Sequence, residues 1–223
     1  MPRAARVDVA DYPYHVINRA ILRLTLFNSP EDYADFEELL LDTAKETSMR
    51  ILAYCLMPNH WHLVLYPARD GDLGLFMHRL TNAHTRQVHA KTGTIGTGPL
   101  YQGRYKSFLI QDDKHLLAVL KYVERNAVRA KLVIHAEDWR WGSAWRRTYG
   151  TLIQKRALAS SPTPLPKSYL KWVNTHEPAE ELKGIRLSVN KSSPYGKDSW
   201  VQKTSEQFGL ESTLRNPGRP RQT

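Results

Sequence analysis

The sequence predicts an α+β fold in which helices pack on an antiparallel sheet. Short apolar stretches with the two-residue period of strands alternate with longer stretches of helical period. Their order along the chain is strand, helix, strand, strand, helix, strand, helix. Only the turn residues Pro58 and Asn59 separate the two adjacent strands, so these strands form an antiparallel hairpin. Together these observations indicate a ferredoxin-like sheet with one additional helix after its last strand.

The first strand is expected over residues 14–18, and the first helix from Pro30 to about Ser48. Apolar residues recur at helical spacing along this helix, and acidic residues occupy its first turn. Ser29 is a suitable N-cap, and proline is favoured at the first helical position after it. The sequence therefore predicts that this helix starts directly after Ser29.

The remaining elements of the core follow from the same patterns. The hairpin strands are expected at 51–57 and 60–66, a second helix from about Leu73 to Lys91, and the last strand at 105–110. The glycine-rich residues 93–99 predict a loop before that last strand. Asp112 is expected to cap a third helix that reaches about Arg125 or beyond.

Three regions of different composition divide the chain. Residues 1–150 hold the predicted core, and Trp139, Trp141 and Trp145 are expected to pack on it as a closing segment. Residues 151–166 predict a linker, because serine and proline are frequent toward their end. Residues 167–223 predict a basic, partly helical extension, with helices at 177–189 and about 197–208.

Composition restricts the classes of protein to which the chain can belong. Of its 223 residues 41% are hydrophobic, yet no stretch approaches the roughly 18 consecutive apolar residues of a membrane span. The N-terminus shows no apolar leader block, and Cys55 is the only cysteine, so no internal disulfide can form. These features favour a cytoplasmic protein with no membrane partner.

The net charge of +10 is unevenly distributed. The predicted first helix is acidic, whereas residues 79–131 carry ten lysines and arginines against three acidic residues, and the extension is also basic. Segregated positive charge is typical of proteins with a polyanionic partner. We therefore favour a nucleic acid partner over the alternative that the basic character serves no specific contact.

The most informative motif is His60-Trp61-His62, at the start of the second hairpin strand. Successive strand residues point to opposite faces, so the two imidazoles share one face and Trp61 lies on the other. Two neighbouring imidazoles suit a single metal ion, although two ligands alone do not define a metal site. The alternative is a pair of strand histidines that are merely exposed or hydrogen-bonded.

The predicted third helix supplies a second group of polar residues. On a helical wheel, Tyr122 shares a face with Asn126 and Arg129 and lies away from the centre of the apolar stripe. This position argues against a core role for the tyrosine. Two histidines and an amide oxygen could hold Mg²⁺ or Mn²⁺ and leave positions open for substrate, and a tyrosine beside such an ion could attack a phosphodiester.

Four stretches carry a joint resemblance to a known family. They are Tyr14–Arg19 (YHVINR), Leu56–Val64 (LMPNHWHLV), Gln102–Lys106 (QGRYK) and Tyr122–Ala130 (YVERNAVRA). Over about residues 12–150 the chain resembles the single-tyrosine HUH transposases, which are named for a histidine–hydrophobe–histidine motif. Among them it is most similar to the REP-associated tyrosine transposases. The segment Gly218–Arg221 (GRPR) also looks like the tail of that group.

This resemblance implies a fold, a reaction and a set of site residues. The implied fold is that of the HUH endonucleases. The implied reaction cleaves and rejoins single-stranded DNA beside hairpins, which are formed by repetitive palindromes of bacterial genomes. By position, His60 and His62 would bind the metal, Asn126 would complete its site, and Tyr122 would form a 5′-phosphotyrosine intermediate.

Two positions depart from the family pattern. Ala20 stands where glycine is frequent, and Ala127 stands where proline is frequent. Ala127 is expected to prolong the helix, since proline would end it. Neither change removes a reacting group, so we expect an active enzyme.

Candidate DNA contacts are the polar and basic residues in and around these motifs. They are Asn18, Arg19, Arg23, Gln102, Arg104, Lys106, Arg125, Arg129, Arg219 and Arg221. The cations would position phosphates, whereas Asn18 and Gln102 could read base edges. Tyr101 and Tyr105 could stack on unpaired bases. The alternatives are solvated surface cations and core tyrosines.

Four further histidines are expected to be structural or surface residues rather than metal ligands. They are His15, His78, His84 and His89.

The sequence thus predicts a metal-dependent single-strand DNA endonuclease and strand transferase, located with the nucleoid in a bacterial cytoplasm. We favour a monomer over a homodimer. Two alternative functions stay open. One is a non-catalytic regulator that binds hairpin DNA, and the other is a metal hydrolase that uses water while Tyr122 is structural.

Overall fold

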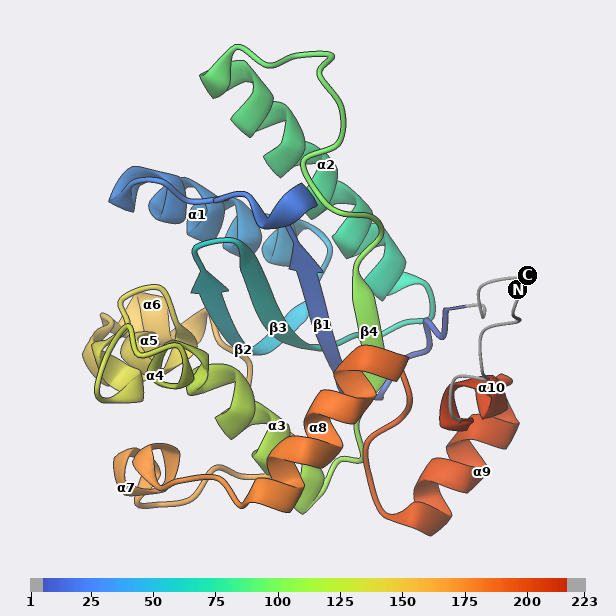
Figure 1. Ribbon diagram of the computed structural model, residues 1–223. Coiled ribbons are helices and arrows are strands. Elements are labelled where there is room, and N and C mark those ends of the chain that lie inside the picture. Colours follow the sequence, from blue (N-terminus) through green and yellow to red (C-terminus); the bar gives the residue numbers. More distant parts are fainter. Residues whose placement is uncertain (1–5, 216–223) are drawn as a thin grey trace.

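The computed structural model describes residues 6–215 and is built on a four-stranded antiparallel sheet (Figure 1). Its strands are β1 (Tyr14–Arg19), β2 (Arg50–Met57), β3 (His60–Tyr66) and β4 (Lys106–Leu109), in the spatial order β2-β3-β1-β4. β1 and β3 are therefore the inner strands, each paired on both edges. This is the predicted ferredoxin-like α+β arrangement, and every strand boundary lies within one residue of its expected place.

Helices α1 (Pro30–Glu46) and α2 (Asp72–Thr92) cover one face of the sheet. The Ser29 hydroxyl accepts a hydrogen bond from the Asp32 backbone N–H, and the Asp32 carboxylate accepts one from the Ser29 N–H. The predicted N-cap is therefore present as a capping box. Alternate residues of β3, beginning with Trp61, point toward these helices and are fully buried.

The opposite face is covered by α3 (Lys114–Glu124) and α8 (Ala179–Lys191). After Arg125 the helical path resumes as α4 (Asn126–Arg129), because the Arg129 N–H donates to the Arg125 carbonyl at 2.9 Å. The chain therefore stays helical past Ala127, as expected where proline is absent.

The N-cap of α3 is Asp113 rather than the predicted Asp112. The Asp113 side chain accepts a hydrogen bond from the His115 N–H at 2.8 Å. Two consecutive aspartates precede this helix, and only the second stands directly before the first helical residue. The correction is one residue and leaves the phase of the helix unchanged.

The chain after α4 covers the outer edge of β2. This segment runs through a 3-10 helix, η2 (Ala136–Asp138), into α5 (Ser143–Tyr149). The Leu56 N–H donates to the Trp141 carbonyl, and the Trp139 indole donates to the Leu56 carbonyl, each at 2.9 Å. Trp139 and Trp141 thereby close the core, as expected from the sequence, whereas Trp145 does not pack on it and instead contacts Tyr149 and Arg140.

Residues 151–166 differ from the predicted linker. They contain α6 (Leu152–Arg156), and the Leu158 side chain is buried in the core. The Ala159 N–H donates to the Ile51 carbonyl of β2 at 2.9 Å. Much of this stretch is therefore packed on the sheet instead of crossing solvent.

The extension also packs on the core (Figure 1). Its described helices are α7 (Tyr169–Asn174), α8, α9 (Asp198–Phe208) and α10 (Glu211–Leu214), so both expected helices are present with small shifts. The backbone carbonyl of Tyr195 accepts from the Gln111 N–H, and the Tyr195 N–H donates to the carbonyl of Leu109, the last residue of β4. Within residues 6–215 each helix is either too short or too polar to cross a bilayer.

Candidate active site

Two imidazoles stand side by side at the start of β3. The rings of His60 and His62 have centroids 5.1 Å apart and lie on the face that α3 covers. Their register neighbours on the inner strand β1 are Arg19 and Ile17. Trp61, between them, is buried on the other face. The strand period therefore produces the shared histidine face.

Each imidazole is oriented through its Nδ1 atom. His60 Nδ1 lies 2.6 Å from the Asn59 side-chain oxygen, and His62 Nδ1 lies 2.8 Å from Nε2 of His15 on β1. A ring that uses Nδ1–H as a donor keeps the Nε2 lone pair for a metal ion. Both Nε2 atoms of the pair are thus suited to ligation.

Burial keeps both rings neutral at physiological pH. Desolvation, followed by the positive charge of Arg19, lowers the pKa of His60 to about 4. Desolvation, followed by the nearby His15 and His60, holds the pKa of His62 well below its ordinary value. Because neutral imidazole is the form that binds metals, protons do not compete with a metal ion for this pair near pH 7.

Tyr122 approaches the histidine pair from α3. Its ring lies edge-on to His62, with centroids 5.9 Å apart, and also edge-on to His15 at 6.2 Å. The guanidinium of Arg129 lies over the ring, 4.0 Å from its centroid. Tyr122 is only 7% exposed, which is more buried than the helical wheel indicates. The wheel ignores the sheet and the later chain, which enclose this helix from outside.

The residues present fit an open divalent site with two imidazole ligands. Within residues 6–215 no three histidine, cysteine or acidic side chains gather into a metal-binding cluster. The amide nitrogen of Asn126, the expected third ligand residue, donates to the Tyr122 and Val123 carbonyls at 3.3 Å each, so this amide is engaged with its own helix. Two neutral nitrogens would leave the other positions of Mg²⁺ or Mn²⁺ to water and phosphate oxygens.

A groove of about 580 Å³ lies along β1 and β4, and its lining includes Arg19 but none of His60, His62 and Tyr122. Five candidate DNA contacts line it, namely Asn18, Arg19, Gln102, Arg104 and Lys106. The last three are exposed, whereas Asn18 is buried and accepts from the Arg19 N–H. Arg19 is the register partner of His60. Its Nε atom is buried and has no hydrogen-bond partner among the described residues. This unpaired donor suits an anionic ligand.

The other candidate contacts have different surroundings. Arg23 is exposed in the 3-10 helix η1 (Ile21–Arg23) and does not line the groove. Arg125 is buried and Arg129 is largely so, and both donate to the carboxylate of Glu177, so the DNA contact expected of Arg125 is not supported. Arg219 and Arg221 lie outside the described residues.

The two candidate stacking residues also differ from each other. Tyr101 is buried, and its hydroxyl contacts the Trp61 indole nitrogen and His84, so stacking on a base is not open to it. Tyr105 lines the groove, with the Arg6 guanidinium 3.8 Å from its ring centroid. Of the two tyrosines expected to stack on bases, only Tyr105 therefore stays a candidate.

Sequence reasoning missed Glu177 next to the site, and it expected His15 to be a structural or surface residue without assigning it the contact with His62. The contact of His15 with His62 depends on the register of β1 against β3, since His15 shares a strand face with Ile17, the register partner of His62. Glu177 gave no such signal, since it lies in a turn far along the chain from the helix it contacts.

Comparisons with known proteins agree with this geometry. Residues 8–126 match the family model described as "Transposase IS200 like". A Haemophilus influenzae protein assigned as a REP-associated tyrosine transposase is 26% identical over 120 residues, which cover 50% of this chain and 68% of the relative.

A solved REP-associated tyrosine transposase, bound to a REP hairpin, has a similar fold. Its TM-score is 0.55 at 18% identity, over 66% of this chain and 84% of that structure. The likeness at this identity concerns the fold, and it extends past the family-matched stretch.

Proposed function

Because the chain belongs to the IS200-like transposase family, we propose that it is a metal-dependent endonuclease and strand transferase for single-stranded DNA. One observation carries the proposal. The ring of Tyr122, from α3, lies edge-on to that of His62, from β3, at a centroid distance of 5.9 Å. The residue proposed as nucleophile and one of the two proposed metal ligands are therefore neighbours, although sixty residues of sequence separate them.

In the proposed reaction the Tyr122 phenolic oxygen attacks a backbone phosphorus. A bond forms between that oxygen and phosphorus, and the bond from phosphorus to the 3′ oxygen breaks. The phenol loses its proton, and the departing 3′ oxygen gains one. The 5′ phosphate stays on the tyrosine, so a second 3′-hydroxyl can reverse the step and join a new strand without ATP.

The surrounding groups would orient and polarise the phosphate. A divalent ion, Mg²⁺ or Mn²⁺, held by His60 and His62 would stabilise the negative charge that builds on the phosphate oxygens. Arg19 would add a cationic donor beside His60, because its buried Nε has no other partner among the described residues. The neutral state of both imidazoles supports this assignment.

The proposed substrate is a strand next to a hairpin of a palindromic repeat. Support comes from the basic groove along β1 and β4 and from the REP hairpin held by the solved relative. Arg104 and Lys106 would hold phosphates, and Gln102 would contact a base. We further propose that the enzyme acts as a monomer beside the nucleoid, which light scattering and fractionation would test.

The direct test is a covalent adduct. Single-stranded hairpin oligonucleotides with randomised flanks, labelled at the 3′ end, are incubated with Mg²⁺ and run on a denaturing gel. The label should migrate with the protein, because the 5′ phosphate of the labelled fragment is attached. Tyr122→Phe should abolish the adduct and keep hairpin binding, whereas the exposed Tyr149→Phe should change neither.

The alternatives give different results in the same assay. Hairpin binding with no cleavage and no metal dependence would indicate a regulator. Cleavage that leaves no label on the protein, and that survives Tyr122→Phe, would indicate a hydrolase that uses water. Either result would overturn the proposal.

A further inference from the structure

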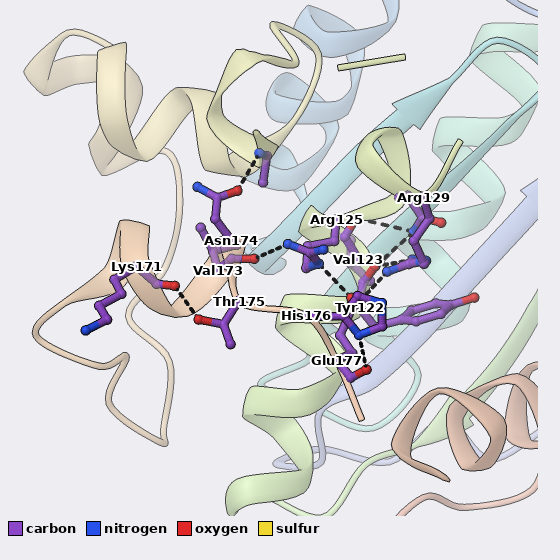
Figure 2. Close-up of polar contacts among 12 residues, drawn as sticks. Tyr122, Val123, Arg125, Arg129, Lys171, Val173, Asn174, Thr175, His176 and Glu177 are labelled. Carbon is purple, nitrogen blue, oxygen red and sulfur yellow. Dashed lines mark hydrogen bonds and ion pairs between the residues drawn. The ribbon is translucent and has the colours of Figure 1, made fainter. Parts of the chain in front are cut away.

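The contact of the extension with the end of α3 and with α4 centres on Glu177, in the turn between α7 and α8 (Figure 2). Its carboxylate accepts from Arg125 Nε at 2.6 Å and from Arg129 Nη1 at 2.5 Å. The Glu177 side chain is only 2% exposed. One buried carboxylate thus holds two guanidinium groups, and the three groups together keep one positive charge.

Arg129 connects this carboxylate to Tyr122. Its guanidinium carbon lies 4.0 Å from the centroid of the Tyr122 ring, and its Nη2 donates to the Tyr122 carbonyl. Figure 2 shows the two arginines converging on Glu177 beside the tyrosine. An arginine with no anionic partner tends to move its charge into solvent. Glu177 therefore keeps the guanidinium on the ring.

Docking of the extension does not depend on Glu177 alone. The Tyr169 hydroxyl donates to the Glu124 carboxylate at 2.7 Å, and the Lys121 ammonium lies 5.9 Å from the centroid of the Trp172 ring. Both contacts join α7 to α3. A change at Glu177 should therefore release Arg129 while the extension stays in place.

We propose that Glu177 is a positioning residue for strand cleavage: it holds Arg129 against Tyr122, and this contact keeps the phenol ring in its place beside His62. The inference rests on the proposed role of Tyr122 as nucleophile. Arg129 and Glu177 both lie beyond residues 8–126, the stretch that matches the family model. In this proposal, residues that follow the family-matched stretch help to position the nucleophile Tyr122.

The test compares Glu177→Gln with Glu180→Gln. Both remove one negative charge from neighbouring positions, but Glu180 is exposed on α8. With the hairpin pool and Mg²⁺, Glu177→Gln should lower the single-turnover rate of adduct formation at saturating DNA by about tenfold or more, because small displacements of a reacting group are costly. Its Kd for DNA should stay near that of the parent chain, and Glu180→Gln should match the parent in both.

A second readout does not involve cleavage. In arginine-labelled protein, the guanidinium NMR signals of Arg129, assigned by their loss in Arg129→Gln, should be protected from exchange in the parent and exposed in Glu177→Gln. If Glu177→Gln folds poorly, the double variant with Arg129→Gln removes the carboxylate and one of its two guanidinium partners, so the net charge of the cluster stays at one positive charge. Its rate should equal that of Arg129→Gln alone, because Glu177 acts through Arg129.

The outcomes separate the two proposals. A parent chain that forms no adduct overturns the proposed function, and this inference with it. A parent chain that forms the adduct, together with a Glu177→Gln variant that reacts at the parent rate, overturns this inference alone. Protected Arg129 signals in Glu177→Gln, or a double variant slower than Arg129→Gln, would also overturn it.

Discussion

His15 Nε2 lies 2.8 Å from His62 Nδ1, and both rings are buried. The remaining His15 nitrogen, Nδ1, is buried without a hydrogen-bond partner among residues 6–215. If His62 donates through Nδ1 and binds a metal through Nε2, the His15 proton must sit on that unpaired atom. The fold then accepts an unsatisfied donor, which costs about 1–3 kcal/mol, to orient one ligand.

This contact predicts the effect of His15→Phe on metal binding. The change keeps an aromatic ring beside Phe108 and removes the acceptor that orients His62. The affinity for Mn²⁺, measured by calorimetry, should fall by roughly tenfold or more. His78→Phe, on the exposed side of α2, serves as the control and should leave the affinity unchanged. Equal affinities for His15→Phe and the parent chain would exclude an orienting role.

The buried His84 predicts how stability depends on pH. Burial lowers the pKa of His84 to about 3, and its Nδ1 contacts the Tyr101 hydroxyl at 2.6 Å. Below pH 6.5 the unfolded chain binds a proton here that the folded chain does not, so stability falls as the pH falls from 6.5 toward 3. His84→Gln should reduce the loss between pH 7 and 4.5 by roughly 2 kcal/mol. Urea unfolding at both pH values measures this, and an equal loss in both proteins would contradict it.

The groove along β1 and β4 predicts a change in the salt dependence of DNA binding. Arg104→Ala and Lys106→Ala each remove one exposed cation from its lining. Each should lower the slope of log K against log salt by roughly one, because one fewer counterion is released. Lys203→Ala, an equal loss of charge on α9, should keep the parent slope. A slope that shifts equally in all three variants would locate binding elsewhere.

Arg125 should behave as a structural residue. Its guanidinium is buried, contacts Glu177, and donates to the Val173 carbonyl at 3.0 Å. Arg125→Ala should lower the free energy of unfolding by roughly 3 kcal/mol, because it removes one partner of a buried ion pair. The salt slope of DNA binding should stay that of the parent chain. A lower slope at parent stability would instead mark Arg125 as a phosphate contact.

The sheet and the histidine face were predictable because both depend on local periodicity. The alternation in β3 places His60 and His62 on one face, and the turn at Pro58 fixes the hairpin to which they belong. Ser29 caps α1 for an equally local reason. In each case the residues that determine the structure lie within a few positions of one another.

The surroundings of Tyr122 were not predictable in this way. A helical wheel describes one helix, whereas the burial of Tyr122 depends on a sheet and on residues that lie far away in sequence. A basic residue such as Arg125 fits a DNA contact or an ion pair equally well until its acidic partner is located. Glu177 lies in a turn without periodicity, so only the tertiary structure brings the two together.

Chain that follows residue 126 bonds to both borders of the sheet, at several residues of β2 and at the last residue of β4. Trp141 bonds to β2, and Tyr195 bonds to the end of β4. Open strand borders pair readily with strands of other molecules. A fragment limited to residues 8–126 would leave both borders bare and would uncover the apolar surface under α8, so we expect it to self-associate. The second half of this protein therefore shields the sheet from intermolecular pairing.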